Sequence, residues 1–274
     1  MTGTGTQADP YIVDTWEDFR TAVSTSGAYV EVKPNTVWNF NELSPTGLPE
    51  TTINCAQING NDCELWHPYV RDNFLFYNAS DAIINKLHIL KLNAEGVNSA
   101  SGFFKTNSIH TQGRCNFCQF SGTLTGSTSY AYFHCANHQA SDIYYSCSIN
   151  LEAAGMFEIT WGSYSDYPRF TDCNIKLECS AVTLTQAMGL VKSQLEYSAD
   201  TAIQLYIDVG SALSVIYPKT KGGSILNDAG ASALILADSS EISSDTTVTN
   251  VTLCTSEQLK DAEYLTSIGF LTGG

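Results

Sequence analysis

The sequence predicts an all-β fold: a single parallel β-helix, that is, a solenoid of short strands, with a short helix at each end. A hydrophobic block recurs at Leu87, Cys118, Cys147 and Cys173, in steps of 31, 29 and 26 residues. Within each block apolar and polar residues alternate, as inward and outward positions of a strand require. Units of this period bury their apolar faces only against their neighbours, which is the signature of a repeat architecture.

A second series of apolar pairs precedes the blocks and predicts two strands per unit. The pairs are Leu75-Phe76, Phe103-Phe104, Tyr132-Phe133, Met156-Phe157, Leu190-Val191 and Ile225-Leu226. Helical repeats would instead show a 3.6-residue period, which is present only near the two ends of the chain. Because the repeat length drifts, we expect insertions in the turns rather than in the strands.

The N-terminal end predicts a capping helix. Thr15 is a suitable N-cap for a helix over residues 16–23, with Glu17 and Asp18 favoured in its first turn by the helix dipole. Its apolar residues share one face, so the helix can cover the open first rung. The first strands are expected at residues 29–32 and 37–40.

The C-terminal end predicts a second helix, capped by Ser256 and running to about Ser267. The whole chain then forms one domain: an N-terminal cap over residues 1–25, rungs over residues 26–240, and a cap or contact segment over residues 241–274.

The composition limits the possible partners. Asp and Glu outnumber Lys and Arg 28 to 13, which gives a net charge of −15. Nucleic acid is not expected as a partner, because phosphate contacts need clustered Lys and Arg. No apolar run is long enough to span a membrane, and no phosphate-binding loop or Ser-His-Asp motif is present. We therefore expect neither a membrane contact nor a cofactor.

The nine cysteines are best explained as structural. Cys118, Cys147 and Cys173 occupy one equivalent position in successive rungs, so they should stack inside the coil as small hydrophobic side chains. A reduced ladder of this kind indicates folding in the cytosol. A zinc site that uses Cys115, His134 and His138 is the alternative. Cys115 and Cys118 converge only across a turn, because residues three apart on a strand point to opposite faces.

The opening segment, Gly3 to Val13, followed by the short helix and a first strand, resembles the start of many right-handed parallel β-helix proteins of the pectin-lyase-like class. Together with Asp62 beside the turn at residues 58–61 and the ending at residues 264–270, it is similar to tailed-phage proteins of that architecture. The resemblance implies a right-handed coil, which is also the general bias of parallel crossovers. It does not imply one chemistry, because this fold hosts lyases, hydrolases, adhesins and passive spikes.

The candidate catalytic residues are acidic and lie around a long aromatic turn. A calcium-dependent lyase needs several carboxylates and a base, and a glycoside hydrolase needs two carboxylates about 5 to 9.5 Å apart. The candidates are Asp142, Glu158, Asp166 and Asp172. Turn-forming Asp and solvated surface Glu explain the same residues, and the sequence favours that interpretation.

The same turn predicts a binding patch. Its aromatic residues are Trp161, Tyr164 and Tyr167, joined by Tyr144 and Tyr145 from the preceding rung. Exposed aromatic rings with polar neighbours suit sugar stacking or protein contact. Packing in the interior is the alternative for some of them.

The sequence thus favours a non-enzymatic structural or adhesive component of a phage virion, such as a head fibre, capsid decoration or tail appendage. The expected partners are other virion proteins, host-surface polysaccharide and further copies of the chain, with three-fold symmetry by analogy. We expect assembly in the host cytoplasm and contacts through residues 234–236 and 248–253. The alternatives are a pectin-lyase-like polysaccharide lyase or hydrolase, and a cellular surface or cytoskeletal scaffold.

Overall fold

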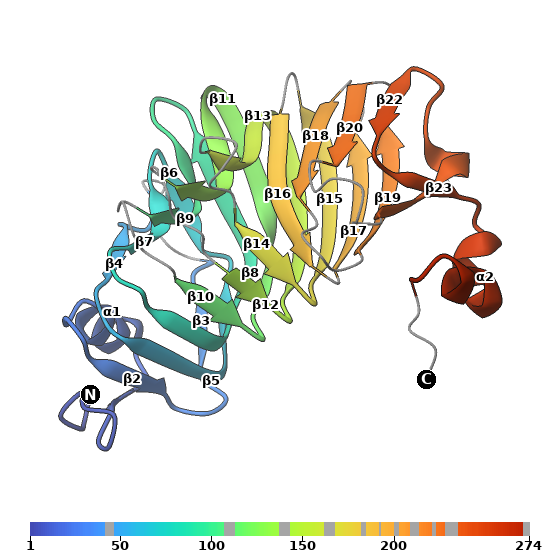
Figure 1. Ribbon diagram of the computed structural model, residues 1–274. Coiled ribbons are helices and arrows are strands. Elements are labelled where there is room, and N and C mark those ends of the chain that lie inside the picture. The colour runs from blue at the N-terminus through green and yellow to red at the C-terminus, as the bar shows by residue number, and fades with distance from the viewer. Residues whose placement is uncertain are drawn as a thin grey trace.

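The computed structural model describes the chain except for residues 42–46, 107–112, 137–142, 162–167, 182–184, 192, 200–202, 209–213, 221–222, 228–234 and 271–274. All the described strands belong to one hydrogen-bonded sheet that winds into a parallel β-solenoid (Figure 1). The predicted all-β parallel β-helix, with a short helix near each end, is confirmed. None of the described helices has the length and apolarity needed to cross a bilayer.

The strands stack into three ladders, which we call A, B and C. Ladder A contains β1 (Tyr11–Val13), β2 (Tyr29–Val32), the first parts of β5 (Gln57–Trp66) and β8 (Ile83–Gly96), β10 (Arg114–Asn116), β12 (Ile143–Tyr145), β14 (Arg169–Thr171), β16 (Thr185–Val191), β18 (Ile203–Asp208), β20 (Gly223–Asn227) and β22 (Thr246–Thr249).

Ladder B contains β3 (Val37–Asn39), the remainders of β5 and β8, β6 (Tyr69–Arg71), the first parts of β11 (Gln119–Ala136) and β13 (Ser148–Trp161), β15 (Asn174–Ala181), β17 (Gln194–Ala199), β19 (Ser214–Thr220), β21 (Ile235–Asp238) and β23 (Thr252–Cys254). Ladder C contains β4 (Thr51–Ile53), β7 (Phe74–Asn78), β9 (Ser101–Thr106) and the remainders of β11 and β13. All the strand pairs are parallel.

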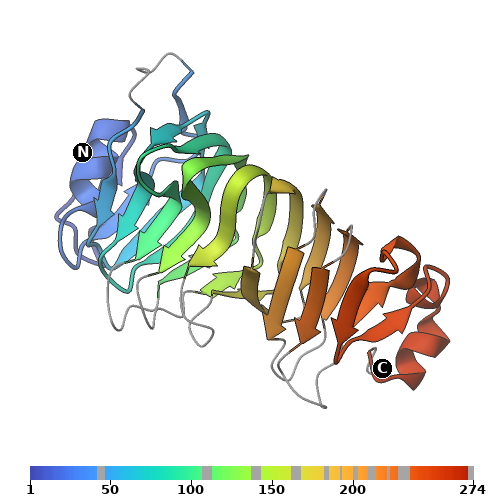
Figure 2. The same cartoon turned by 90° about the horizontal axis from the view of Figure 1, so that it is seen from above.

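The number of residues in each turn of the solenoid falls along the chain. Cys115 pairs with Tyr144, 29 residues later, whereas Phe170 pairs with Leu190, only 20 residues later. The difference arises because ladder C ends at β13 within the described residues, and later turns consist of ladders A and B. Figure 2 shows these rungs following one another from the N-terminal to the C-terminal end.

The prediction that the second series of apolar pairs marks one equivalent strand in every unit is therefore wrong in part. Phe76 does pair with Phe104 in ladder C, but Phe104 pairs with His134, so Tyr132-Phe133 is displaced by one residue. Leu190-Val191 and Ile225-Leu226 lie in ladder A instead. An apolar pair looks the same in every ladder, because each ladder has one face towards the interior.

Aromatic rings fill the N-terminal part of the interior. The ring centroid of Phe133 lies 5.3 Å from that of Phe103 and 5.2 Å from that of Tyr144, and Tyr144 stacks on Phe170 at 5.1 Å. Beyond Phe170 the buried core of the described residues contains no aromatic ring and consists of leucine, isoleucine, valine and cysteine side chains. The change in core composition coincides with the loss of ladder C.

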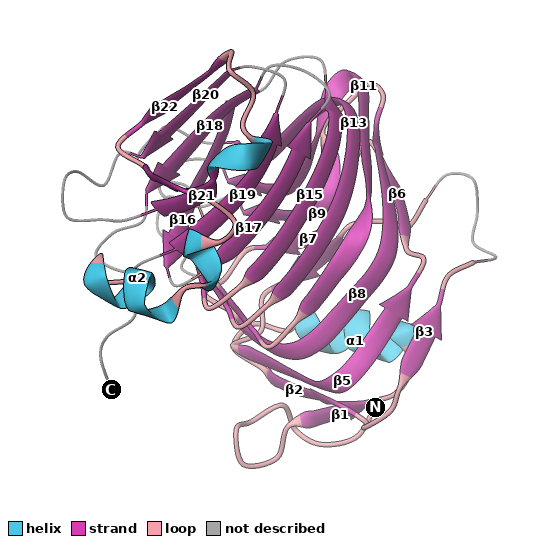
Figure 3. Ribbon diagram, turned by 90° about the vertical axis from the view of Figure 1, so that its right-hand side faces the viewer, coloured by secondary structure: helices cyan, strands magenta, loops and turns pink. Residues whose placement is uncertain are grey.

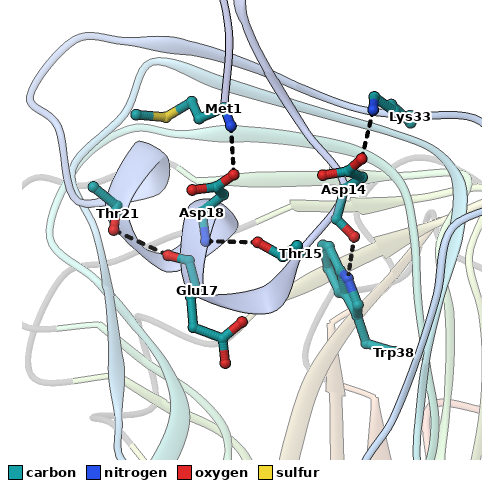
Figure 4. A network of polar contacts seen from close by, with 8 residues as sticks. All are labelled: Met1, Asp14, Thr15, Glu17, Asp18, Thr21, Lys33 and Trp38. Carbon is teal, nitrogen blue, oxygen red and sulfur yellow. Dashed lines mark hydrogen bonds and ion pairs between the residues drawn. The ribbon is translucent and has the colours of Figure 1, made fainter.

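The predicted N-terminal helix is confirmed as α1 (Trp16–Val23). The Thr15 hydroxyl accepts a hydrogen bond from the backbone N–H of Asp18 at 3.2 Å, as an N-cap should (Figure 4). Trp38 donates from Nε1 to the Asp14 carbonyl at 3.0 Å, and Lys33 forms an ion pair with the Asp14 carboxylate. These contacts fasten α1 to the first rungs, where Trp16 and the other apolar residues of its inner face are buried.

The single helix predicted near the C-terminus is wrong in detail. A 3₁₀ turn, η3 (Gln258–Lys260), is followed by a separate helix, α2 (Ala262–Ser267), and a further 3₁₀ turn, η2 (Ser239–Glu241), precedes them. Asp261 starts α2 because its carboxylate accepts from the N–H groups of Glu263 and Tyr264. Ser256 caps no helix, since its hydroxyl donates to the Asp238 carboxylate.

Candidate functional site

A shallow groove runs over the outer face of ladder B, across strands β8, β11, β13, β15 and β17. Three adjoining hollows of about 720, 450 and 320 Å³ form it. The first shares Asn150 with the second, and Glu152 with the third, so the hollows are continuous. Alternation along each strand produces this face, because Leu151, Leu177 and Leu195 point inwards and their neighbours outwards.

The outward side chains form rows that cross the strands. The first row is Ser121, Asn150, Lys176 and Glu196, and the second is Asn93, Thr123, Glu152, Glu178 and Ser198, each residue paired with the next in the adjacent rung. Since neighbouring strands lie about 4.8 Å apart, each row presents a hydroxyl, amide or charged group at that interval. We call these two rows the groove rows.

The charges of the groove rows converge on one lysine. The Lys176 ammonium lies 2.7 Å from a carboxylate oxygen of Glu178. That hydrogen bond, together with the charges of Glu178, Glu196 and Glu152, raises the pKa of Lys176. Glu152 and Glu178 stand directly opposite each other on adjacent strands, an arrangement that is repulsive without a counter-charge. Lys176 therefore partly balances the carboxylates of the groove rows.

An aromatic ring lies at the N-terminal margin of the groove. Lys91, which lines the groove, places its ammonium 5.3 Å from the ring centroid of Trp66. The Trp66 indole donates from Nε1 to the Glu64 carboxylate at 2.6 Å, which sets the orientation of the ring. The half-buried indole thus combines an oriented apolar surface with neighbouring polar groups.

This arrangement suits binding better than catalysis. Hydroxyls, amides and carboxylates offer both donors and acceptors to a ligand rich in hydroxyl groups. Glu152, Glu178 and Glu196 are all solvent-exposed, on an open face rather than in a closed, water-excluding cleft. Within the described part of the chain, no group of three or more His, Cys, Asp or Glu side chains is placed to hold a metal ion.

The predicted acidic set is not brought together in the described residues. Asp172 is exposed at a corner between ladders A and B, where its left-handed backbone (φ 52°) forms the turn. This is a conformation that Asp tolerates better than most residues. Glu158 belongs to β13, where its backbone pairs with Tyr132, but its side chain lies outside the described residues. Asp142 and Asp166 also lie outside them.

The predicted aromatic patch needs a correction. Tyr144 is wrong as a surface binding residue: it is only 1% exposed and packs in the core. Tyr145 is 39% exposed, and its ring meets that of Phe117 edge-on, with centroids 5.7 Å apart. The two differ because adjacent residues of a strand point to opposite faces. The Trp161 side chain, Tyr164 and Tyr167 lie outside the described residues.

Two of the three candidate metal ligands do lie near each other. Cys115 and His134 line one small cavity of about 10 Å³, together with Tyr144. Both ring nitrogens of His134 are hydrogen-bonded, Nδ1 to the Tyr144 hydroxyl at 2.8 Å and Nε2 to the Thr106 hydroxyl at 3.1 Å. His134 is therefore part of a buried polar network. His138 lies outside the described residues.

The interior cysteine ladder is present, and it continues as serine. The Cys147 N–H donates to Cys173 Sγ at 3.4 Å, the Cys173 N–H to Ser193 Oγ at 3.0 Å, and the Ser193 N–H to Ser214 Oγ at 3.2 Å. All nine cysteines are buried and free. The neighbouring Cys118 thiol, together with burial, raises the pKa of Cys147 to about 12, which keeps it a neutral, unreactive thiol.

The groove rows were missed from the sequence, although a signal is present. A Leu-Glu pair occurs in each of three successive ladder B strands, at 151–152, 177–178 and 195–196. In a strand this pair means one inward apolar and one outward acidic residue. The pairing register nevertheless does not place the three glutamates in one row. Glu152 pairs with Glu178, but Glu196 pairs with Lys176.

No family model matches the chain, and no curated protein sequence matches it. Among solved structures, the chain is similar to a proposed immunoglobulin A1 protease from Bacteroides ovatus. The identity is 12%, the match covers 97% of this chain and 90% of that chain, and the TM-score is 0.39. A likeness this weak assigns no activity to the present protein.

Proposed function

We propose that the protein is a non-enzymatic adhesive scaffold whose groove rows bind an extended, hydroxyl-rich polymer such as a polysaccharide chain. The observation that carries the proposal is the repetition of polar side chains across consecutive strands of ladder B. A ligand with a short, regular repeat can meet equivalent groups at intervals of about 4.8 Å along the groove. Trp66 supplies an apolar surface on which a sugar ring can stack.

The charge of the groove favours a neutral glycan. Three exposed carboxylates surround a single lysine in the groove rows, and the chain as a whole carries a net charge of −15. An acidic polysaccharide would meet like charges at the groove and be disfavoured. The same argument weighs against a lyase acting on acidic glycans.

The setting that we propose is a phage virion, with other virion proteins as partners. It rests on the resemblance of the two ends of the sequence and on the rod-like solenoid, which suits an appendage. Mass spectrometry of particles purified from the source of this gene tests it. A stoichiometric signal from intact particles is expected, and its absence from particles that contain all their other structural proteins would contradict the setting.

A glycan panel followed by titration calorimetry tests the binding proposal. We expect a neutral oligosaccharide to bind and Asn150→Ala to weaken its binding about two- to tenfold, the effect of one lost hydrogen bond. Glu178→Gln should weaken binding by a similar factor, because it removes the Lys176 ion pair that orders the groove. Glu17→Gln, an exposed change on α1 far from the groove, is the matched control.

An enzymatic role is the second candidate, and one observation favours it. Glu152 and Glu178 are directly paired carboxylates on adjacent strands, and a pair of carboxylates is what glycoside hydrolysis requires. Prolonged incubation with the bound glycan and analysis of its chain length tests this role. Shortening that disappears in both Glu152→Gln and Glu178→Gln would replace the adhesive proposal by a hydrolase.

A further inference from the structure

The two ends of the solenoid finish differently. At the N-terminal end, α1 covers the interior with the buried rings of Trp16 and Phe19. The outer edge of β1 is occupied as well, because Thr2 and Ile12 form an antiparallel bridge with two backbone hydrogen bonds, at 3.1 and 2.8 Å. This end therefore presents neither an open core nor a free edge at β1, whereas β3 and β4 pair on one side only among the described strands, with β5 and β7.

At the C-terminal end the interior is covered only in part, because Ile242, Val248 and Val251 pack against the core but stay half-buried. Ile216, Ala237 and Leu253 are consecutive members of one inward row of ladder B. Ile216 is 1% exposed, whereas Leu253 at the end of the row is 47% exposed. Helix α2 does not cover it, because Leu265 packs with Val215 and Cys254, which lie on the outer side of the same strands. Figure 3, viewed onto this end, shows α2 to one side of the strands.

The backbone at this end is also available. β23 pairs with β21 on one side, and no strand within the described ranges pairs with its other edge. Residues 246–256 contain no charged residue and no proline. Charges, prolines and covering segments are the usual devices that prevent edge-to-edge pairing, and this edge lacks the first two. In a chain of net charge −15, a neutral edge is the place where two copies can meet without repulsion.

We propose that the C-terminal end is an interface with the C-terminal end of a second copy of this chain. The two β23 edges pair antiparallel about a two-fold axis, so that each copy covers the Leu253 of the other. Head-to-tail association is disfavoured, because α1 covers the interior at the N-terminal end and leaves no open core for Leu253 to enter. A two-fold contact uses the same surface on both copies and closes after two subunits. This symmetry differs from the three-fold symmetry expected by analogy.

Sedimentation equilibrium across a series of protein concentrations tests the interface. The unmodified chain should behave as a dimer, and Leu253→Glu should raise its dissociation constant at least about tenfold, because each dimer then buries two charges at the contact. Val37→Glu, at a residue 55% exposed near the N-terminal end, is the matched control and should remain dimeric. Circular dichroism spectra must agree among the three proteins. A monomeric unmodified chain, or a dimer that survives Leu253→Glu, would overturn the proposal.

A distance measurement distinguishes the two-fold dimer from other assemblies. All nine native cysteines are buried, so a cysteine introduced by Thr249→Cys can be spin-labelled selectively. In the dimer the two labels at residue 249 should lie near each other, and the labels of Val37→Cys should lie far apart. Short distances for Val37→Cys, or a trimeric mass, contradict the two-fold arrangement.

Discussion

The N-terminal and C-terminal halves of the solenoid bury their interiors in different ways. Up to β13 three ladders enclose a core of aromatic rings in mutual contact, closed at its end by α1. After β14 two ladders enclose a core of aliphatic and cysteine side chains within the described residues, and α2 packs on the outside rather than over the end. In a solenoid each rung is stabilised by its neighbours alone, so the two halves need not be equally stable. We expect the N-terminal half to be the more stable.

The largest expected effect comes from the aromatic core. Phe133→Ala removes a ring that meets Phe103 and Tyr144, and should lower the free energy of unfolding by about 3 to 5 kcal/mol. All four tryptophans lie between residues 16 and 161, so tryptophan fluorescence during denaturation reports on this half. Hydrogen exchange should become faster in β9, β11 and β13 and stay unchanged in β17 and β19. Equal acceleration in both halves would mean that they unfold as one unit.

Close packing in ladder C gives the next effect. A Cβ at Gly102 would lie 2.0 Å from the Tyr132 carbonyl oxygen of the adjacent rung, a backbone atom that cannot turn away. Gly102→Ala should therefore cost about 1 to 3 kcal/mol through overpacking. Gly27→Ala is the control, because no atom lies within 4 Å and only its left-handed φ of 69° opposes the change. Thermal unfolding compares the two, and a Gly102→Ala protein as stable as the control would contradict this packing.

The thiol and hydroxyl ladder joins the two halves, because the same position is cysteine from Cys118 to Cys173 and serine from Ser193 onwards. Cys173→Ser should change the free energy of unfolding by about 1 kcal/mol or less, since a hydroxyl can make the same hydrogen bonds. Cys173→Ala should cost about 1 to 2 kcal/mol, because the acceptor of the Cys147 N–H is lost. Urea denaturation measures both, and equal losses would show that packing alone matters at this position.

Acid should lower the stability of each half by protonating one carboxylate, Asp72 in the N-terminal half and Asp238 in the C-terminal half. The Ser99 N–H, with those of Asn98 and Val97, lowers the pKa of Asp72 to about 2 from an ordinary 3.8. A lowered folded pKa means stabilisation above about pH 4 that is lost as the pH falls from 4 towards 2. Hydrogen bonds from Ser240 and Ser256 lower the pKa of Asp238 in the same direction. Asp72→Asn should flatten the dependence of the unfolding temperature on pH over this range.

The Asp238→Asn variant separates the contribution of Asp238 to acid unfolding from that of Asp72. It should alter acid unfolding chiefly in the C-terminal half, where the carboxylate joins η2 to Ser256. Tyrosine and tryptophan signals followed separately against pH give the comparison. A loss of tryptophan signal in Asp238→Asn at a higher pH than in the unmodified protein would show that the halves are coupled.

Much of the fold was predictable because it depends on local patterns. The alternation at Cys118, Cys147 and Cys173 placed a ladder inside the coil, and Thr15 with its amphipathic helix placed α1. Cys63 belongs to the same ladder through its pairing with Leu87, but a bulge between Asn59 and Cys63 concealed it. The break before α2 was missed because Asp261 and Ser256 are equally good caps in sequence. Only the contact between Ser256 and Asp238 decides between them.

The candidate site was predicted less well, because it depends on register between rungs. Tyr144 and Tyr145 could have been separated by alternation, since one of two adjacent strand residues must face the interior. The groove rows could not have been predicted in this way. Whether Asn150, Lys176 and Glu196 are neighbours depends on the turn lengths of three rungs. A shift of one residue in any turn would send these side chains to the interior.

The sequence by itself determined that this chain is a parallel solenoid, that Cys118, Cys147 and Cys173 face its interior, and that α1 closes its first rung. These properties follow from the two-residue period of strands and from helix capping, both of which act within a few residues. Only the tertiary structure decided where ladder C ends, which polar side chains form the groove rows, and that Leu253 remains exposed. Those properties depend on inter-rung register and on where α2 packs, and the free energies that decide both come from contacts distant in sequence.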